Sequence, residues 1–232
     1  MPCADSDTNH IFLGHLMQRT LIAAALAATT LFTSAHAASI SGLVNTGLAA
    51  QGQQDSNYTL TAASSDTVIS NTHGYVAYDN QWPINPWLAN DDTSRWITPT
   101  ASQGQTFDAN ASGTYTFHLS FDLTGYNAAT AAFTGRFSAD NAAEIKLNGV
   151  TIATGTGFTS WHDFGANSGF QAGANSLDFV LTNFAQNGGN PAGLRVEFST
   201  STIAAVPEPE TYAMLIAGLG LVGFAARRRK QA

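Results

Sequence analysis

The sequence predicts an all-β domain, an antiparallel β-sandwich of jelly-roll type, between an apolar segment near the N-terminus and an apolar helix near the C-terminus. Apolar residues occupy every odd position from Tyr115 to Leu123, and the dipeptide Asn148-Gly149 separates two further alternating stretches. Alternation places one face of a strand in the core and the other in water, and Asn-Gly favours a tight hairpin turn. Between residues 38 and 205 the sequence shows no helical period.

The predicted strands are short and are joined by loops of unequal length. They cover residues 39–44, 58–62, 74–78, 95–97, 115–123, 133–137, 145–147, 150–152, 177–181 and 194–198. Residues 80–92 are expected to form a long loop, and Asp140-Asn141 a turn between two strands. No internal repeat is present, so a sandwich fits better than a propeller or a solenoid. The residues predicted to face the core are Phe117, Leu119, Phe121, Phe137, Leu147, Phe179 and Val196.

The N-terminal segment, residues 1–37, resembles a leader followed by a secretory signal peptide. Arg19 precedes a mostly apolar stretch, residues 21–32, and Ala35-His36-Ala37 supplies the small residues that precede a signal peptidase site. We expect cleavage after Ala37. Translation is expected to start at Met17, because acidic residues precede it and make a poor positive region. The single cysteine, Cys3, then lies outside the mature chain, whose stability must come from its core.

The mature segment, residues 38–205, is acidic. It keeps four of the nine Lys and Arg residues and twelve of the sixteen Asp and Glu residues, which is a net charge of −8. Nucleic acid and anionic lipid are poor partners for such a surface, whereas cations and neutral polar ligands remain compatible with it. Its length suits one domain, and we expect a sandwich over residues 38–199 and a linker over residues 200–205.

The C-terminal segment, residues 206–232, combines three features. The residues Val206-Pro207-Glu208-Pro209 come first, an uncharged apolar run over residues 212–226 follows, and the cations Arg227, Arg228, Arg229 and Lys230 come last. As a helix the run reaches about 22 Å, which is short of the roughly 30 Å hydrocarbon core of a bilayer. The prolines should keep residues 207–210 out of a helix, and the cations should stay cytoplasmic. We therefore expect a short transmembrane helix that inserts only transiently into the inner membrane.

These three features, in this order, resemble the PEP-CTERM sorting signal of Gram-negative bacteria. The resemblance covers residues 206–230 and implies that an exosortase recognises the motif in the membrane and removes the tail. It also implies export across the inner membrane, after cutting by signal peptidase, to the cell surface or extracellular matrix, and an association with exopolysaccharide and biofilm. The alternative, an ordinary C-terminal anchor, needs neither the prolines nor the arginines.

Part of the central domain resembles galactose-binding-domain-like jelly rolls. The resemblance lies in residues 135–149, which read as a strand, an Asp-Asn turn, a second strand and an Asn-Gly hairpin. It continues in residues 173–177, with Gly, Asn and Leu at alternate positions, and in residues 191–194. It covers residues 114–199 and implies a sandwich of two sheets. Folds of this type host many functions, so a site has to be argued from its own residues.

The tryptophans are the candidates for a ligand site. Trp82 and Trp87 lie with Asn85 in the long loop, and Trp161 lies further along the chain. Sugar rings stack their apolar faces on aromatic side chains, and their hydroxyls need short polar partners. We therefore expect Trp82, Trp87, Asn85 and Trp161 to contact a carbohydrate. The alternative is that the tryptophans, above all Trp87 and Trp96, plug the open end of the sandwich.

Acidic and histidine residues give weaker signals. Asp91-Asp92 and Asp140-Asn141 offer oxygen ligands to a structural calcium ion, but Asp and Asn equally favour turns, and no other cofactor is expected. His118 falls on the wet face of its strand, and the neighbours His162 and Asp163 should point to opposite faces of an extended segment.

Enzyme motifs are absent from the sequence. It contains no nucleophile elbow, phosphate loop or zinc motif, so we expect no enzyme. A glycosidase pair of carboxylates follows no spacing rule and stays an alternative.

The sequence thus favours an exported, exosortase-processed surface or extracellular-matrix protein that binds carbohydrate or exopolysaccharide through its sandwich. The alternative is a non-catalytic structural or adhesive biofilm matrix protein without a specific ligand. An exposed patch that holds two of the four tryptophans favours binding, and burial of all four favours the structural role.

Overall fold

The structure is a computed structural model that describes residues 37–206 and 209–230. Residues Ala37–Ala205 form one compact unit of strands, and helix α2 (Pro209–Lys230) lies outside that unit. The predicted start site and most of the predicted signal peptide, residues 1–36, fall outside the described residues and stay predictions.

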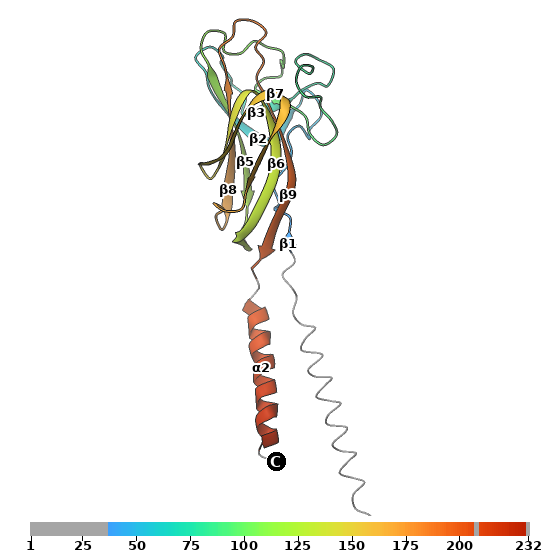
Figure 1. The fold of residues 1–232 in the computed structure, drawn as a ribbon, viewed down its shortest axis with the longest axis vertical. Helices are drawn as coiled ribbons and strands as arrows, with labels where there is room; N and C mark the ends of the chain where they lie inside the picture. Colours follow the sequence, from blue (N-terminus) through green and yellow to red (C-terminus); the bar gives the residue numbers. More distant parts are fainter. Residues whose placement is uncertain (1–36, 207–208, 231–232) are drawn as a thin grey trace, which may run out of the picture. The chain divides into compact units, whose positions relative to one another are not determined.

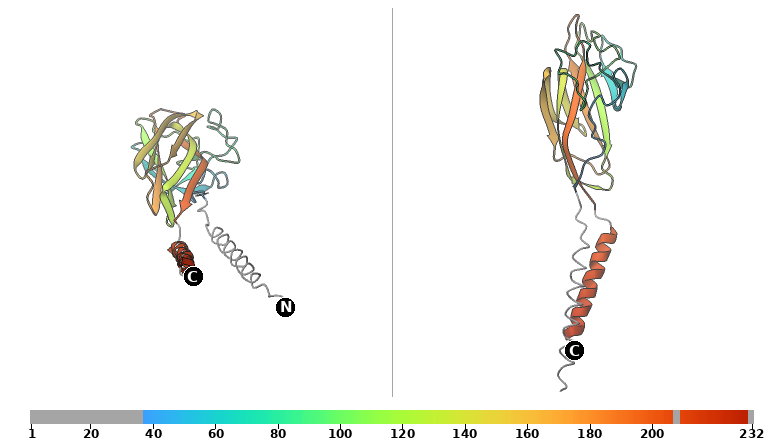
Figure 2. Two further views of the ribbon diagram at one scale, coloured as in Figure 1. Left: turned by 60° about the horizontal axis from the view of Figure 1, so that its bottom comes forward. Right: turned by 90° about the vertical axis from the view of Figure 1, so that its right-hand side faces the viewer.

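The strands form an antiparallel β-sandwich, which confirms the predicted fold class (Figure 1). Their order is β1-β9-β4-β3-β2-β5-β8-β6-β7, and β9 also pairs with β6, so that the sheet closes on itself. Figure 2 shows the strands wrapped around a common interior. The strands are β1 (Ala37–Ala38), β2 (Gln54–Ala63), β3 (His73–Val76), β4 (Ile97–Thr98), β5 (Gly113–Asp122), β6 (Tyr126–Leu147), β7 (Val150–Ala166), β8 (Ala174–Asn183) and β9 (Gly193–Ala205).

Strand β6 belongs to both layers of the sandwich. Its residues up to Asp140 pair with β9, and its residues from Ala142 pair with β8. The predicted turn at Asp140-Asn141 is therefore wrong, because the chain continues there as one strand of 22 residues. The register between β6 and β7 shifts at the same place. Bends and bulges of this kind let a strand leave one sheet and enter the other.

The core matches the alternation in the sequence. All seven residues predicted to face inward are buried, and the most exposed of them, Phe121, shows only 5% of its surface. Leu147 pairs with Val150 across the predicted hairpin, where Asn148 and Gly149 have φ values of 50° and 82°. A turn with positive φ at both central residues is the type I′ turn that Asn-Gly favours.

Two local predictions at the ends of the domain are wrong. The first strand is Ala37–Ala38 and not residues 39–44. Residues 200–205 are not a linker, because they continue β9, where Ala204 pairs with Ala37 of β1 and with Asn127 of β6. Their alternation is weak in sequence, since small and polar residues dominate this part of the strand.

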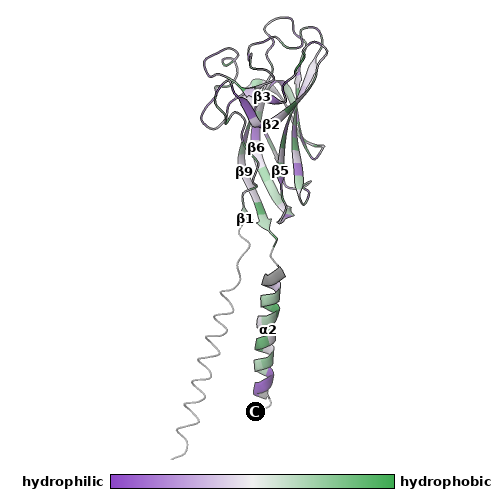
Figure 3. Ribbon diagram, turned by 180° about the vertical axis from the view of Figure 1, so that it is seen from behind, coloured by the Kyte–Doolittle hydropathy of each residue, from purple (hydrophilic) through white to green (hydrophobic). Residues whose placement is uncertain are grey.

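Helix α2 covers the predicted apolar run and the basic end. It begins at Pro209, so the expectation that residues 209–210 stay out of a helix is wrong, while residues 207–208 lie outside the described part. Proline suits the first position of a helix, where its missing N–H has no partner to lose. Figure 3 shows the helix as mostly hydrophobic, with a hydrophilic C-terminal end. Among the described residues, no helix combines the length and the hydropathy that crossing a membrane requires.

Candidate binding site

Two of the four tryptophans form a buried cluster beneath the long loop. Trp87 is 3% exposed, Trp96 is fully buried, and their ring centroids lie 4.3 Å apart. Trp96 Nε1 donates to the carbonyl of Leu88 at 2.8 Å, and a Cβ added at Gly193 would lie 2.3 Å from the Trp87 ring. Trp87 was expected to contact a ligand, and this expectation is corrected: its indole fills the interior, where a ligand cannot reach it.

Asp140 fixes the indole of Trp87. Trp87 Nε1 donates to Asp140 Oδ2 at 2.9 Å, and Asn141 Nδ2 donates to Asp140 Oδ1 at 2.8 Å. The carboxylate is only 4% exposed, and this burial raises the pKa of Asp140 to about 6. The hydrogen bond from Trp87 acts in the opposite direction but is outweighed. Asp140 thus has a structural role beside the tryptophan cluster.

Trp82 is the exposed tryptophan of the loop. It shows 46% of its surface, and Tyr78, four residues earlier, shows 39%. Buried Gln103 holds this part of the loop: its Oε1 accepts from the N–H of Tyr78 at 2.6 Å, and its Nε2 donates to the carbonyl of Trp82 at 3.2 Å. The Trp82 ring lies against Gly104, where an added Cβ would come within 2.9 Å of the indole. We name residues 78–82 the aromatic loop.

Short polar side chains lie beside the aromatic loop. Asp79 accepts from Gln51 Nε2 at 2.5 Å and from Asn90 Nδ2 at 3.1 Å, and lies 3.5 Å from Arg95 Nε. Asn85, the predicted polar partner, is exposed in a turn with a φ of 62°, and its N–H donates to the carbonyl of Trp87 at 3.3 Å. Asn adopts a positive φ more readily than most residues, so the turn alone explains why an asparagine occupies position 85.

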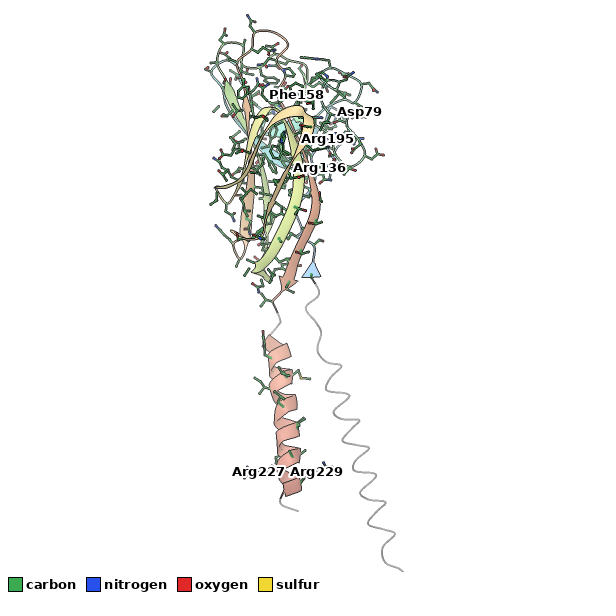
Figure 4. The ribbon with its side chains drawn as sticks, viewed as in Figure 1. Asp79, Arg136, Phe158, Arg195, Arg227 and Arg229 are labelled. Carbon is green, nitrogen blue, oxygen red and sulfur yellow. The ribbon has the colours of Figure 1, made fainter. Side chains whose placement is uncertain are left out.

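Trp161 lies over a group of charged residues rather than beside Trp82. Its half-buried ring has the guanidinium carbon of Arg136 at 4.4 Å and that of Arg195 at 4.9 Å. Arg136 donates through Nε to Glu197 Oε2 at 2.7 Å, and Arg195 Nη2 lies 3.3 Å from Glu197 Oε1. Figure 4 shows Arg136 and Arg195 in the same part of the sandwich as Phe158 and Asp79.

The charged side chains beneath Trp161 form hydrogen bonds and ion pairs with one another and with their neighbours. Arg195 is fully buried and also contacts Ser94, Ala89 and Asp91. Guanidinium groups that stack on an aromatic face and pair with a carboxylate form a stable arrangement without any ligand. Trp161 therefore covers a buried ion pair, and this structural role accounts for its position.

The acidic pair proposed for calcium is engaged by arginines. Asp91 lies 2.9 Å from Arg195, and Asp92 lies 3.7 Å from Arg95. Burial alone would raise the pKa of Asp91, but the N–H groups of Ser94 and Thr93, together with Arg195, lower it below its usual value. Within residues 37–206 and 209–230, no three His, Cys, Asp or Glu side chains come together as a metal site would require.

The two histidines of interest have structural partners. His118 Nδ1 lies 2.6 Å from Asp178 Oδ1 on the wet face of β5 and β8. His162 packs its ring 5.5 Å from that of Phe137, and its Nε2 lies 2.8 Å from the carbonyl oxygen of Thr156.

Two shallow grooves lie on the outer faces of the sandwich. The larger, about 530 Å³, is lined mainly by Ala142, Glu144, Thr154, Thr156, His162 and Thr182. The smaller, about 360 Å³, is lined by residues of β6, β7 and β9, including Phe133 and Thr200. Neither groove includes a tryptophan, so the exposed aromatic surface lies elsewhere.

Residues 205–230 match the family model described as the PEP-CTERM protein-sorting motif. The chain carries a PEP-CTERM sorting motif. The match begins at the last residue of β9 and extends to the last residue of α2. It confirms the sorting signal predicted from Val206-Pro207-Glu208-Pro209 and the basic end.

The sandwich of this PEP-CTERM protein is similar to several solved structures at low identity. A family 35 carbohydrate binding module from an environmental isolate is 15% identical, with a TM-score of 0.27, and the match covers 71% of this chain and all of that one. The family 11 carbohydrate-binding module of a cellulosomal cellulase of Clostridium thermocellum is 10% identical, with a TM-score of 0.32, and the match covers 76% and 98%. The PA14 sugar-binding domain of an RTX adhesin is 16% identical, with a TM-score of 0.23, and the match covers 42% of this chain and 56% of that one. No curated protein matches the chain.

The sequence identified Trp82 but not the residues that hold it. Tyr78 lies just before the predicted loop and reads as the end of a strand, and Gln103 lies 21 residues beyond Trp82 in a segment without periodicity. Polar side chains that clamp a distant loop leave no sequence pattern, because their partners are backbone carbonyls. No ring contact among the described residues joins Trp82 to Trp161, so the exposed aromatic residues of the loop are Trp82 and Tyr78 and no second tryptophan joins them.

Proposed function

We propose that this PEP-CTERM protein is an exported, exosortase-processed surface or matrix protein whose sandwich binds carbohydrate, such as exopolysaccharide, through the aromatic loop. The observation that carries this proposal is the exposure of Trp82 on a segment that a buried side chain fixes in place. An indole left half in water forgoes a large part of the stabilisation that its burial would give. A ligand that covers the indole recovers that free energy.

The fixed geometry of the aromatic loop supports binding. Gln103 is 5% exposed and reaches Tyr78, Gln81 and Trp82 through one amide group, so the loop is ordered before any ligand arrives. Preorganisation lowers the entropy cost of binding. Asp79, Asn90 and Gln51 lie close by and offer hydrogen-bonding groups to sugar hydroxyls, which an aromatic surface alone does not.

The charge of the domain favours a neutral glycan. Residues 38–205 have a net charge of −8, and Asp79, Asp91 and Asp92 all lie in the loop region. The nearby cations Arg95 and Arg195 are paired with those carboxylates. A polyanionic chain would therefore be repelled over most of this surface.

The sorting motif supports the destination. A PEP-CTERM motif implies export and exosortase processing at the membrane. We propose that signal peptidase removes the leader, that the tail enters the inner membrane transiently, and that the processed domain reaches the cell surface or the extracellular matrix. The cut after Ala37 would shorten β1 to Ala38, which pairs with Ile203.

A structural or adhesive matrix protein without a ligand is the second candidate. The observation in its favour is the burial of Trp87 and Trp96, which leaves Trp82 as the one strongly exposed tryptophan of the described residues. This candidate differs from the first only in what Trp82 contacts, so a binding measurement distinguishes them.

The test is a glycan array with the detergent-purified full-length chain, followed by titration of any glycan that binds. Trp82→Ala should weaken binding by about tenfold or more, because a truncated tryptophan anchor costs upward of about 1.4 kcal/mol. Phe184→Ala is the matched control, since Phe184 is a similarly exposed aromatic (50%) on another loop, and it should bind as the wild type does. A wild type that binds no glycan would support the structural candidate, and equal binding by both variants would remove the aromatic loop as the site.

A further inference from the structure

The sequence contains two Asn-Gly dipeptides, and the structure gives them different surroundings. Asn148-Gly149 forms the hairpin between β6 and β7, and Asn187-Gly188 lies in the loop between β8 and β9. In such a dipeptide the backbone nitrogen of the glycine can attack the side-chain amide of the asparagine, because glycine has no Cβ to obstruct the approach. The sequence makes no distinction between the two dipeptides, so their contacts decide which of them reacts.

Hydrogen bonds hold the side chain of Asn148 in place. Its Nδ2 donates to the carbonyl of Gly169 at 2.8 Å and to Asn175 Oδ1 at 2.9 Å, and its Oδ1 accepts from the N–H of Ser176 at 2.9 Å. The main chain is fixed as well, since the N–H of Asn148 donates to the carbonyl of Ser176 at 2.9 Å. The amide must break these contacts before its Cγ can meet the nitrogen of Gly149.

The surroundings of Asn187 leave its side chain accessible. Asn187 is exposed, and within residues 37–206 and 209–230 no hydrogen bond engages its side-chain amide or the N–H of Gly188. Gly188 and Gly189 have φ values of 83° and 60°, and a Cβ added at either would meet nothing within 4 Å. Two consecutive glycines with open space around them allow the main chain to approach the amide and allow water to enter.

We propose that Asn187 is a modification site at which the folded protein deamidates spontaneously, while Asn148 keeps its amide. The nitrogen of Gly188 forms a bond to Asn187 Cγ and the Cγ–Nδ2 bond breaks, so that ammonia leaves with the proton that the Gly188 nitrogen gives up. The product is a five-membered cyclic imide. The proposal is independent of carbohydrate binding.

Water completes the reaction by opening the imide at one of two bonds. Cleavage between Cγ and the Gly188 nitrogen gives aspartate, and cleavage between the main-chain carbonyl carbon of residue 187 and that nitrogen gives isoaspartate. Both products add one negative charge at neutral pH to the net charge of −8 of residues 38–205. Because the reaction needs water and no enzyme, the added charge accumulates with time in every copy that is not degraded.

The contacts at both ends of the loop confine the change. The N–H of Phe184 donates to Asn141 Oδ1 at 2.7 Å. Buried Asn190 donates through Nδ2 to the carbonyl of Phe107 at 2.6 Å and to that of Phe184 at 2.9 Å. Isoaspartate inserts one methylene into the main chain between these fixed points, within an exposed loop that tolerates it, so the sandwich should stay folded.

The test compares the folded protein with the unfolded chain. Detergent-purified full-length protein is incubated in mildly alkaline buffer, a second portion is incubated in concentrated guanidinium chloride, and mass spectrometry follows the peptides that contain Asn148 and Asn187. In the folded protein Asn187 should deamidate at least about tenfold faster than Asn148, because the contacts of Asn148 must break first. In the unfolded chain the two rates should be similar.

Three results of this comparison would overturn the proposal. They are a folded protein in which Asn148 reacts as fast as Asn187, a folded protein in which Asn187 keeps its amide, and a ratio of the two rates that is the same in the folded and the unfolded portions.

Two variants and the product distribution identify the route. Asn187→Asp carries the charge of the product and serves as the standard in ion-exchange chromatography. Asn187→Gln keeps an amide, but the ring that it would form is larger and closes more slowly, so this variant should acquire the charge more slowly than the wild type. Isoaspartate in excess over aspartate at position 187 marks the imide, since direct hydrolysis of the amide gives aspartate alone. A wild type that yields only aspartate, or an Asn187→Gln variant that gains charge as fast as the wild type, would contradict the assigned site and route.

Discussion

Replacing Asp140 by Asn should stabilise the protein at neutral pH. Burial raises the pKa of the Asp140 carboxyl from 3.8 to about 6 in the folded chain. A difference of about two pKa units between folded and unfolded states corresponds to about 3 kcal/mol. Because the pKa is higher in the folded state, the protonated Asp140 carboxyl contributes about 3 kcal/mol to the free energy of unfolding below about pH 4, where the carboxyl is protonated in both states. This stabilising contribution is lost as the pH rises through about 6, the pKa in the folded state. At neutral pH the wild type therefore bears the cost of a buried charge.

The Asp140→Asn variant removes that cost but also loses a contact. An Asn side chain keeps an oxygen for Trp87 Nε1, while the hydrogen bond from Asn141 is lost at a cost of about 1 kcal/mol. The expected net gain is about 2 kcal/mol at about pH 7, with no gain or a small loss at about pH 4.

Urea unfolding of the wild type and Asp140→Asn at the two pH values measures this difference. The difference between the two proteins is the useful quantity, because carboxyls with lowered pKa, such as those of Asp66 and Asp122, affect both proteins alike. A stability difference that does not change between the two pH values would refute the assigned role of Asp140.

Two further predictions concern the core and the tail. Phe121→Ala should lower the free energy of unfolding by roughly 3–5 kcal/mol, because it empties a core position where the ring centroids of Phe121 and Phe170 lie 6.4 Å apart. The melting temperature should then fall by roughly 10 °C. A nearly unchanged thermal melt would mean that Phe121 does not lie on the buried face of β5. Replacing Pro207-Glu208-Pro209 with alanines should leave an unprocessed, full-mass protein in the inner membrane and no surface material, as read by mass spectrometry and cell fractionation. Normal processing of that variant would instead make the tail an ordinary anchor.

The predictable parts of this fold are those where one face of a strand is buried. β5 and β8 alternate between core and water, so the sequence indicated which of their residues face the core, and Asn148-Gly149 placed the hairpin. The region around Asp140 was misread because Asp and Asn usually mark turns. Here Asp140 lies inside a strand and binds the indole of Trp87, a contact across 53 residues that no local pattern records.

The candidate site was only partly predictable for a related reason. A tryptophan in a loop has the same sequence signature whether it faces a ligand or fills the interior. Trp82 and Trp87 are five residues apart, yet one is 46% exposed and the other 3%. Their fates depend on residues far along the chain, Gln103 for Trp82 and Asp140 with Gly193 for Trp87.

The course of β9 determines how the domain would respond to mechanical load. The strand starts at Gly193, against the ring of Trp87, and ends at Ala205, where the sorting motif begins. A pull between the loops at the start of β9 and the chain beyond Ala205 would act along the axis of β9. Its ladder to β6 extends from Asp140 to Tyr126, so the rungs would be sheared together rather than opened one after another. Shear of this kind resists rupture because the whole ladder must slip before any part of the strand is released.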